Sequence, residues 1–248
     1  TAAFNFENKS VHTIRVKVTD AGMSFEKAVP VTVTDANDDP VGIIIDNNTV
    51  LEGLNKGTTV GTLSAIDEDS GDSHTFGLVP TLLDQFFSIS GSTLKTNAVL
   101  DYEDQTSHDV LINVTDSAGA VFSQAVTINV INTNDPPTGL TLDPGIISED
   151  APVGSETGLL AAIDTDVGDT HTFAITGGAD KSALRIEGNK LLTKTLLDYE
   201  TRPELEVTIR VTDSEGEKAE FTLKVTVTNE NDPPSDIILT PDTFAENQ

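Results

Sequence analysis

One short segment, Asn-Asp, recurs at a fixed interval along this chain of 248 residues. It stands at residues 37–38, 134–135 and 231–232, so consecutive copies are 97 residues apart. Each copy follows a run of β-branched residues, and a glutamate stands 15 residues after each of the three asparagines. Because separate markers agree on one interval, the sequence predicts a tandem array with a unit of 97 residues.

The strands of each unit are visible as an alternation of apolar and polar residues. Residues 205–211 and 223–227 alternate with a period of two, as do residues 110–114 and 14–18. Such alternation in β-branched residues is typical of half-buried strands, and no stretch has a helical period over three turns. The sequence therefore predicts an all-β fold in which each unit is an immunoglobulin-like β-sandwich of seven antiparallel strands.

The Asn-Asp pairs also place the expected domain boundaries. Residues 39–135 and 136–232 are predicted to be two complete repeats. Residues 1–38 correspond to the C-terminal part of a repeat, and residues 233–248 to the N-terminal part of a further one. The stretch equivalent to 55–96 is present in neither fragment. Either the chain comes from a longer array, or flanking residues are missing from it.

The charge of the chain excludes several classes of partner. Asp and Glu number 41 against 14 Lys and Arg, and the net charge is −27. This balance disfavours nucleic acid, whose phosphates need basic patches, and anionic membrane surfaces. No apolar run is long enough to span a membrane, and the first 30 residues do not resemble a signal peptide. Because cysteine is absent, disulfides and thiolate metal sites are excluded.

The recurring positions are mostly carboxylates and side-chain amides, which are hard oxygen ligands. Calcium accepts about six to eight oxygens in irregular geometry. Crowded carboxylates repel one another unless a divalent cation neutralises them. An EF-hand loop would need a glutamate at its twelfth position, but counting from Asp67 and Asp164 reaches Leu78 and Ile175. The sequence therefore predicts calcium sites of another type.

Taken together, the recurring segments resemble the extracellular repeats of cadherins. They are the glutamate near the unit start, Asp-x-Asp, Leu-Asp-Tyr-Glu, Val-Thr-Asp and the Asn-Asp-Pro linker, and they cover the whole chain. The resemblance implies Greek-key sandwiches in which ligands from one repeat, the linker and the following repeat enclose several calcium ions per junction. Residues 71–76 and 168–173 are most similar to the cadherin-like repeats of large bacterial surface adhesins.

The cadherin resemblance assigns calcium ligands at three junctions. After the first complete repeat, the ligands would be Glu52, Asp101, Glu103, Asn134, Asp135, Asp164, Asp166 and Asp213, with the carbonyls of Thr133 and Pro136. At the junction after residue 38 they would be Glu7, Asn37, Asp38, Asp67, Asp69 and Asp116, with the carbonyls of Ala36 and Asp39. At the junction after residue 232 they would be Glu149, Asp198, Glu200, Asn231 and Asp232. Because Asn5 replaces the aspartate of Leu-Asp-Tyr-Glu, we expect fewer or weaker ions at the junction after residue 38.

Four histidines and a recurring acid pair invite a catalytic interpretation. His74 and His171 are equivalent in the repeat, as are His12 and His108, whereas a catalytic triad is a single constellation. We expect these histidines to be structural residues lying in strands. No set of nitrogen or sulfur ligands has the spacing of a zinc site. The acids of Leu-Asp-Tyr-Glu could serve a glycosidase, but they recur beside each linker, so metal ligation explains them better. We expect no enzymatic activity.

The function implied by this resemblance is mechanical. We expect a calcium-stiffened array, extracellular or at a cell surface, that acts as a spacer. Its partners would be calcium and neighbouring repeats of the same chain, with a protein or glycan partner elsewhere in the full protein left open. A second interpretation is a directly adhesive module, homophilic or binding carbohydrate or protein. A third is an accessory module of a secreted enzyme.

Overall fold

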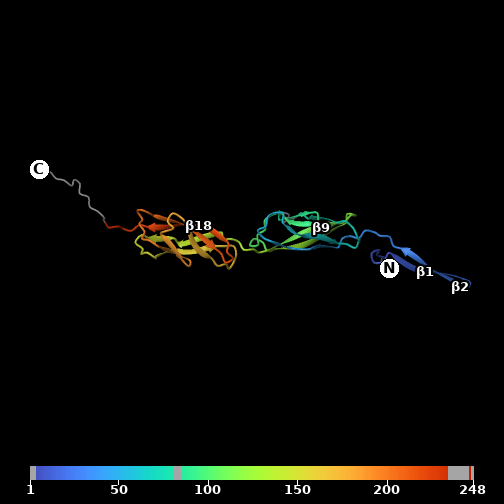
Figure 1. Cartoon of the computed structure of the whole chain (residues 1–248). Helices are drawn as coiled ribbons and strands as arrows, with labels where there is room; N and C mark the ends of the chain where they lie inside the picture. Colours follow the sequence, from blue (N-terminus) through green and yellow to red (C-terminus); the bar gives the residue numbers. More distant parts are fainter. Residues whose placement is uncertain (1–3, 81–84, 234–245, 247–248) are drawn as a thin grey trace. The chain divides into compact units, whose positions relative to one another are not determined.

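The computed structural model describes residues 4–80, 85–233 and 246, and it divides the chain into two compact units. The first unit is Thr1–Thr133 and the second is Asn134–Gln248. Each unit contains a β-sandwich, seen around the labels β9 and β18 in Figure 1. The N-terminal hairpin of β1 (Val11–Asp20) and β2 (Met23–Thr32) belongs to the first unit. Of the fragment expected at 233–248, only Pro233 and Glu246 lie among the described residues.

The sandwich of the first unit consists of two four-stranded sheets. One sheet has the order β3-β5-β8-β7, with strands Gly42–Ile45, Thr59–Ile66, Thr93–Thr96 and Phe87–Ser90. The other has the order β4-β10-β9-β6, with strands Thr49–Leu51, Val121–Ile131, Ser107–Thr115 and Thr75–Leu78.

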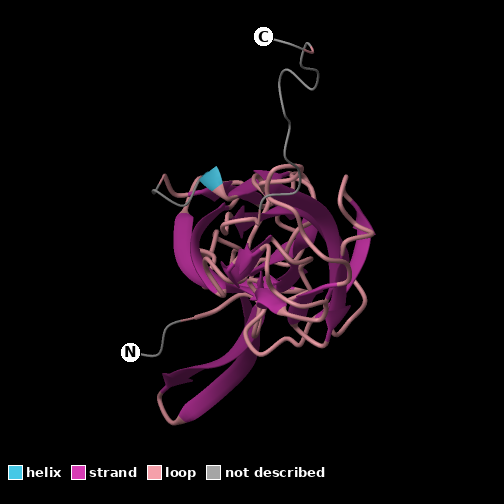
Figure 2. Cartoon of the chain, turned by 90° about the vertical axis from the view of Figure 1, so that its left-hand side faces the viewer, coloured by secondary structure: helices cyan, strands magenta, loops and turns pink. Residues whose placement is uncertain are grey.

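The second unit repeats this arrangement. One sheet has the order β11-β13-β16-β15, with strands Gly139–Pro144, Glu156–Ile163, Lys190–Thr193 and Leu184–Glu187. The other has the order β12-β18-β17-β14, with strands Ile146–Ser148, Lys218–Thr228, Glu204–Thr212 and Thr172–Gly177. Figure 2 shows that the described part of the chain consists mostly of strands connected by loops. The predicted all-β sandwich is therefore confirmed.

The strand count and direction differ from the prediction in one respect. The first strand of each sandwich is divided into two segments that join different sheets, so each sandwich has eight strands instead of seven. The second segment pairs in parallel with the last strand, as Thr49 to Leu51 do with Asn129 to Ile131. The division occurs at Asn47, whose Nδ2 donates to the carbonyls of Thr49 and Val60 and so holds a turn between the segments.

The core lies between the two sheets of each sandwich. In the first unit Leu94, Ile112 and Ile128 are fully buried, and they come from three strands of both sheets. In the second unit the alternating residues Leu205, Val207, Ile209 and Val211 of β17 are also fully buried. The alternation read from the sequence therefore marks the inner face of each sheet.

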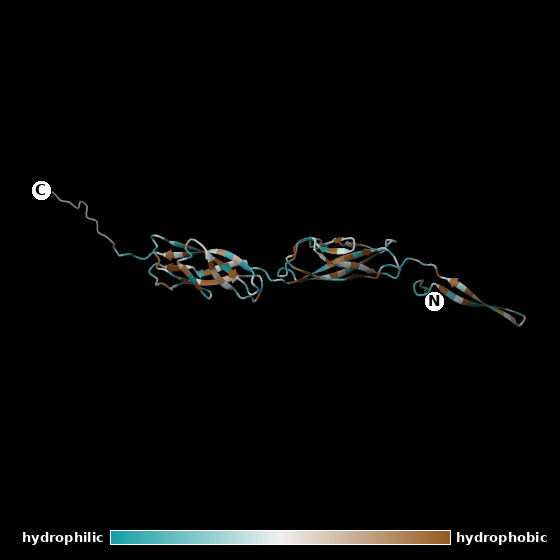
Figure 3. Cartoon of the chain, in the orientation of Figure 1, coloured by the Kyte–Doolittle hydropathy of each residue, from teal (hydrophilic) through white to brown (hydrophobic). Residues whose placement is uncertain are grey.

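The hairpin β1 (Val11–Asp20) and β2 (Met23–Thr32) has the sequence of a sandwich hairpin but not its burial. Ile14, Val16 and Val18 occupy positions equivalent to three core residues of β9, yet they are 43–63% exposed. In Figure 3, hydrophobic residues, coloured brown, lie along the strands of the hairpin as they do along the strands of each sandwich. Among the described residues, no helix is long and apolar enough to cross a membrane.

Candidate metal centres

A buried glutamate near the start of each sandwich holds two separate backbone segments. Glu52 is 5% exposed, and its carboxylate accepts hydrogen bonds from the amides of Tyr102 (2.5 Å) and Thr133 (2.6 Å). Glu149 does the same with Tyr199 and Glu230, both at 2.7 Å. The carboxylate therefore connects the Leu-Asp-Tyr-Glu loop to the segment that leaves the last strand.

Two further acids lie beside this glutamate in the first unit. Carboxylate oxygens of Glu52, Asp101 and Glu103 lie within 4.8 Å of one another. Nδ2 of Asn132 donates to Oε1 of Glu103 at 2.9 Å, and in the second unit Nδ2 of Asn229 donates to Oε1 of Glu200 at 2.8 Å. Each unit thus gathers carboxylates at the end of the sandwich where the last strand ends.

The Asn-Asp pairs face a second group of acids at the start of the following sandwich. In the first unit the amide of Asp38 donates to Asp69 at 2.7 Å, and Nδ2 of Asn37 donates to Asp116 at 2.8 Å. The second unit has the same two bonds, from Asp135 to Asp166 (2.7 Å) and from Asn134 to Asp213 (2.9 Å). The linker is therefore attached to the Asp-x-Asp loop and to the Val-Thr-Asp turn in both units.

The buried aspartate of each Val-Thr-Asp turn is stabilised in its ionised form. A hydrogen bond from Asn37, with others from the amides of Ala120 and Gly119, lowers the pKa of Asp116. Burial acts to raise the pKa of Asp213. Hydrogen bonds from Asn134 and from backbone amides of its turn outweigh burial, and the pKa is lowered. Both aspartates are thus available as anionic ligands.

The first unit also brings Glu7 into this region. Oxygens of Glu7 lie within 4.8 Å of those of Asp35 and Asp69, and also of those of Asp38 and Glu68. A backbone hydrogen bond acts to lower the pKa of Glu7, but desolvation and the charges of Asp35 and Asp38 raise it overall. This crowding of like charges is the condition that a divalent cation would relieve.

Asp38 experiences the same crowding. Desolvation is the largest cause of its raised pKa, followed by the charges of Glu68, Asp69 and Asp67. Asn5, which replaces the aspartate of Leu-Asp-Tyr-Glu, donates to Glu68 at 2.7 Å and so fills the position with a neutral donor. The prediction of fewer or weaker ions here stays a prediction.

A histidine contacts the first aspartate of each Asp-x-Asp segment. Nε2 of His74 lies 2.9 Å from Oδ2 of Asp67, and Nε2 of His171 lies 2.7 Å from Oδ2 of Asp164. Both histidines stand just before a strand, β6 or β14, so the expectation that they lie in strands is wrong. His12 and His108 do lie in strands, β1 and β9.

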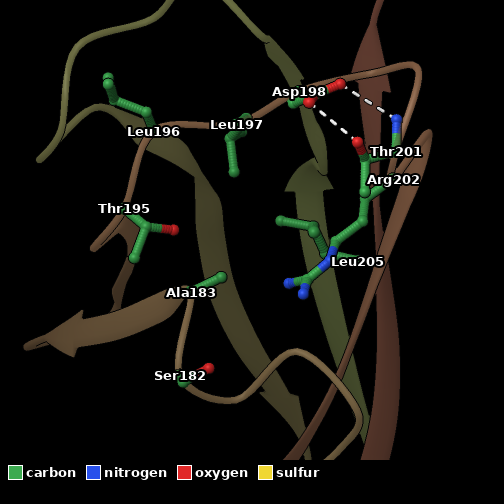
Figure 4. A pocket seen from close by; sticks show the side chains of 9 residues that line it. All are labelled: Ser182, Ala183, Thr195, Leu196, Leu197, Asp198, Thr201, Arg202 and Leu205. Atoms are coloured by element: carbon green, nitrogen blue, oxygen red, sulfur yellow. Dashed lines mark hydrogen bonds between the residues drawn. The ribbon is translucent and has the colours of Figure 1, made fainter.

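Asp198 lies in a small pocket of the second unit, and this pocket tests the acid-pair interpretation. Figure 4 shows both oxygens of Asp198 turned toward Thr201, which donates from its amide at 3.0 Å and from its hydroxyl at 2.8 Å. These bonds lower the pKa of Asp198. The pocket is otherwise lined by neutral side chains and Arg202, so it contains no second carboxylate for a glycosidase pair.

The predicted site residues fall into groups that the structure brings together within each unit. Glu52, Asp101 and Glu103 form one group, and Glu7 shares one group with Asp69 and another with Asp38. The carbonyls of Ala36, Asp39, Thr133 and Pro136, and the ligand role of every residue in the set, stay predictions. Sequence reasoning missed several acids and amides that join these groups: Asp35, Glu68, Asp72, Asp169, Asn132 and Asn229. Asp72 and Asp169 recur at the unit spacing, which was the signal that could have identified them.

The chemistry of these groups fits calcium. Apart from the two histidines, the polar side chains gathered around the Asn-Asp pairs offer carboxylate and amide oxygens, which calcium prefers. The acids are close enough to share an ion, and the pKa values of Glu7 and Asp38 are raised by their neighbours. Structural zinc, by contrast, is bound mostly by Cys and His, and the chain contains no cysteine.

Comparison with known proteins agrees with this fold and chemistry. Residues 144–228 match the Cadherin domain family. The chain is 30% identical to human protocadherin gamma-C5 over 253 residues, covering 92% of this chain and 27% of that protein. It is 29% identical to human protocadherin gamma-B5, covering 84% of this chain and 24% of that protein. Residues 144–228 therefore form a cadherin-type repeat, and the chain spans about a quarter of the length of these relatives.

Solved structures give the same result. The extracellular domain of protocadherin gamma-B4 is 26% identical with a TM-score of 0.61, covering 93% of this chain and 39% of that one. The relatives named here are animal proteins and do not support the likeness to bacterial adhesins. The cadherin match confirms the prediction that the chain is not an enzyme. It also confirms that the chain is an extracellular, cell-surface region.

Proposed function

We propose that this chain is a calcium-binding part of an extracellular adhesion protein of protocadherin type. The observation that carries the proposal is the repeated joining of the Asn-Asp pair to an Asp-x-Asp aspartate and a Val-Thr-Asp aspartate, in both units, with near-identical distances. The similarity to protocadherin extracellular domains favours adhesion over a spacer without a partner.

The positive charge of calcium would balance the negative charge of these clustered carboxylates. Within each unit, the linker pair and its two partner aspartates would bind the ion together, and Asn37 or Asn134 would orient one of those partners. At the other end of a sandwich, the buried glutamate, the Leu-Asp-Tyr-Glu acids and the following asparagine would form the second set of ligands. Because these ligand sets recur every 97 residues, the set at the end of one repeat and the set at the start of the next would share ions across a junction. The shared ions would restrict the relative motion of the repeats.

Calcium binding is tested first by calorimetric titration of the full chain, alongside small-angle scattering with calcium and with chelator. We expect several ions to bind and the maximum dimension to become better defined with calcium. A D166N/D213N double variant removes two acids of one set and should lose the ions that depend on them. Its matched control, D69N/D116N, leaves that set intact and affects only the equivalent set.

Adhesion is tested separately with beads coated with the full chain. Aggregation that requires calcium would support a directly adhesive, homophilic module. Beads that stay dispersed while the protein binds calcium would favour a spacer whose adhesive residues lie elsewhere in the protein. Absence of calcium binding in the titration would contradict both versions.

A further inference from the structure

We propose that His74 and His171 are positioning residues for the cation sites. Each histidine holds the first aspartate of its Asp-x-Asp segment in a fixed orientation before an ion binds. A neighbouring aspartate, Asp72 or Asp169, joins the same loop to the Val-Thr-Asp turn. This inference rests on the proposed calcium binding and adds residues outside the set of oxygen ligands.

The contact between each histidine and its aspartate is short and largely shielded from water. Nε2 lies 2.9 Å from Oδ2 of Asp67 in the first unit and 2.7 Å from Oδ2 of Asp164 in the second. The side chains of both aspartates are 4% exposed, and those of the histidines are 15% and 13% exposed. An ionised carboxylate has no hydrogen to donate, so the hydrogen in each bond belongs to Nε2.

The other oxygen of each aspartate is also held. Oδ1 of Asp67 accepts the amide of Asp69 at 3.0 Å, and Oδ1 of Asp164 accepts the amide of Asp166 at 3.2 Å. With one donor on each oxygen, the carboxylate plane cannot rotate freely. Each oxygen keeps a lone pair for a cation, because a carboxylate oxygen has two. The histidine thus orients a ligand without occupying its coordination position, a role that partners of metal ligands commonly have.

The second aspartate of this group connects two loops that carry predicted ligands. Oδ2 of Asp72 accepts the amide of Ser117 at 3.3 Å, and Ser117 follows Asp116 directly. In the second unit, Oδ1 of Asp169 accepts the hydroxyl of Ser214 at 3.0 Å, and Ser214 follows Asp213. Polar atoms of each histidine and of its two aspartates lie within 4.8 Å of one another. The group therefore sets the distance between the Asp-x-Asp loop and the Val-Thr-Asp turn.

The separation within each pair is that of a hydrogen bond between histidine and aspartate, and it differs from that of two ligands on one zinc ion. Two ligands that bind one zinc ion at ~2.0–2.1 Å in a tetrahedron would lie ~3.3 Å apart. The observed separations between Nε2 and Oδ2, 2.7 Å and 2.9 Å, are those of a hydrogen bond. Recurrence of the complete group in both units indicates that it belongs to the repeated site.

The test uses the full chain at pH 8 with His171→Phe and His171→Gln. Phenylalanine keeps the ring and removes the donor, whereas glutamine keeps a donor that reaches about as far as Nε2. Calcium is titrated while amide NMR signals of Gly168 and Glu215 report the second unit and those of Gly71 and Ala118 report the first. The first unit, with His74 intact, is the internal control, and unfolding without calcium checks that each variant is folded.

We expect His171→Phe to weaken calcium binding in the second unit by about 10- to 100-fold, the usual effect of removing a partner of a metal ligand. His171→Gln should recover most of this loss, and binding in the first unit should not change. Wild-type affinity in His171→Phe, or equal loss in both variants, would overturn the inference while leaving calcium binding intact. Zinc binding through Nε2 in calcium-free protein would also overturn it. If the wild type binds no calcium, the proposed function itself fails.

Discussion

Asn134 and Asp213 are 79 residues apart in the chain, and Nδ2 of the asparagine donates a 2.9 Å hydrogen bond to Oδ2 of the aspartate. Asn37 and Asp116 repeat this relationship at 2.8 Å, also 79 residues apart. In each unit the linker amide thus compensates a carboxylate that is only 6% exposed. The asparagine is as important to the site as the acids around it.

The first prediction concerns Asn134→Ala in calcium-free protein. The lowered pKa of Asp213 depends on the hydrogen bond from Asn134 acting against burial, so removing the bond should raise this pKa. A carboxyl group with a lowered folded pKa contributes stability above its ordinary value, 3.8, and loses it as pH falls through the folded pKa. The variant should lose part of that contribution. Carbon NMR titration of Asp213 measures it, and Asn37→Ala, which should affect Asp116 instead, is the control.

The second prediction is that Asp38→Asn stabilises the calcium-free first unit at neutral pH. The pKa of Asp38 is raised by desolvation and by neighbouring acids, so the ionised form is disfavoured in the folded state. Stability is therefore lost as pH rises from 3.8 through the raised pKa, and the variant should show a smaller loss. Calcium affinity should fall by about tenfold because a charged ligand is removed. Thermal unfolding with and without calcium gives both results.

Asp20→Asn is the control for this charge change, because Asp20 lies exposed at the end of β1, where the hairpin turns. The prediction is contradicted if Asp38→Asn lowers the melting temperature of the protein equally with and without calcium. In that case, repulsion between Asp38 and the neighbouring acids is not the cause of the raised pKa of Asp38.

The third prediction is that Glu52→Gln destabilises the first unit even without calcium. Glutamine keeps the shape of the side chain but offers one acceptor oxygen to two backbone donors, the amides of Tyr102 and Thr133. One partly buried N–H loses its partner, at a cost of about 1–3 kcal/mol. Chemical denaturation should show this loss, whereas Glu103→Gln, at an exposed position, should change calcium affinity with little effect on the calcium-free protein. Equal stability of the two variants would contradict the structural role of Glu52.

The fourth prediction concerns the pH dependence of His108 in the first core. His108 is 2% exposed and contacts the rings of Phe86 and Phe87, and its Nδ1 is buried with no hydrogen-bond partner among the residues that the structure describes. Burial lowers its pKa below 6.5, with Asp104 acting weakly in the opposite direction. The unfolded state therefore binds more protons between the folded pKa and 6.5, and stability should fall as pH decreases through this window.

His108→Leu should remove this pH dependence. The equivalent residue of the second unit is Leu205, which is fully buried, so leucine fits the corresponding position of a related core. Unfolding free energies measured between pH 5 and 8 test the prediction. A wild-type profile that is flat across this range, or a variant that keeps the slope, would show that another group is responsible.

The fifth prediction tests the bulge that turns β5. Pairing between β5 and β8 shifts register between Thr59 and Gly61, and a Cβ at Gly61 would lie 2.3 Å from the carbonyl oxygen of Asn47. Because that oxygen belongs to backbone, Gly61→Ala should cost about 1–3 kcal/mol or more. Gly77→Ala is the matched strand control, since a Cβ there meets no atom of the described residues within 4 Å. Similar melting temperatures for the two variants would be incompatible with this close approach.

The repeat, the strands and the types of ligand could all be predicted from the amino-acid sequence. The alternation in residues 205–211 depends on local geometry, because successive side chains of any strand point to opposite faces, so β17 could be recognised without knowing its neighbours. The interval of 97 residues likewise shows that the acids belong to a repeated site. Neither observation shows which acids lie close together in the folded chain.

Which of these residues lie close together, and which groups are buried, follows only from the tertiary structure. Glu52 reaches Thr133 across 81 residues, and Asp38 reaches Asp69 across 31, only because particular strands pair and the sandwich closes. The division of the first strand at Asn47 likewise depends on a bond to the next strand, in which Nδ2 of Asn47 donates to the carbonyl of Val60. Periodicity records which face a residue occupies, whereas the partners across that face follow from sheet pairing and packing.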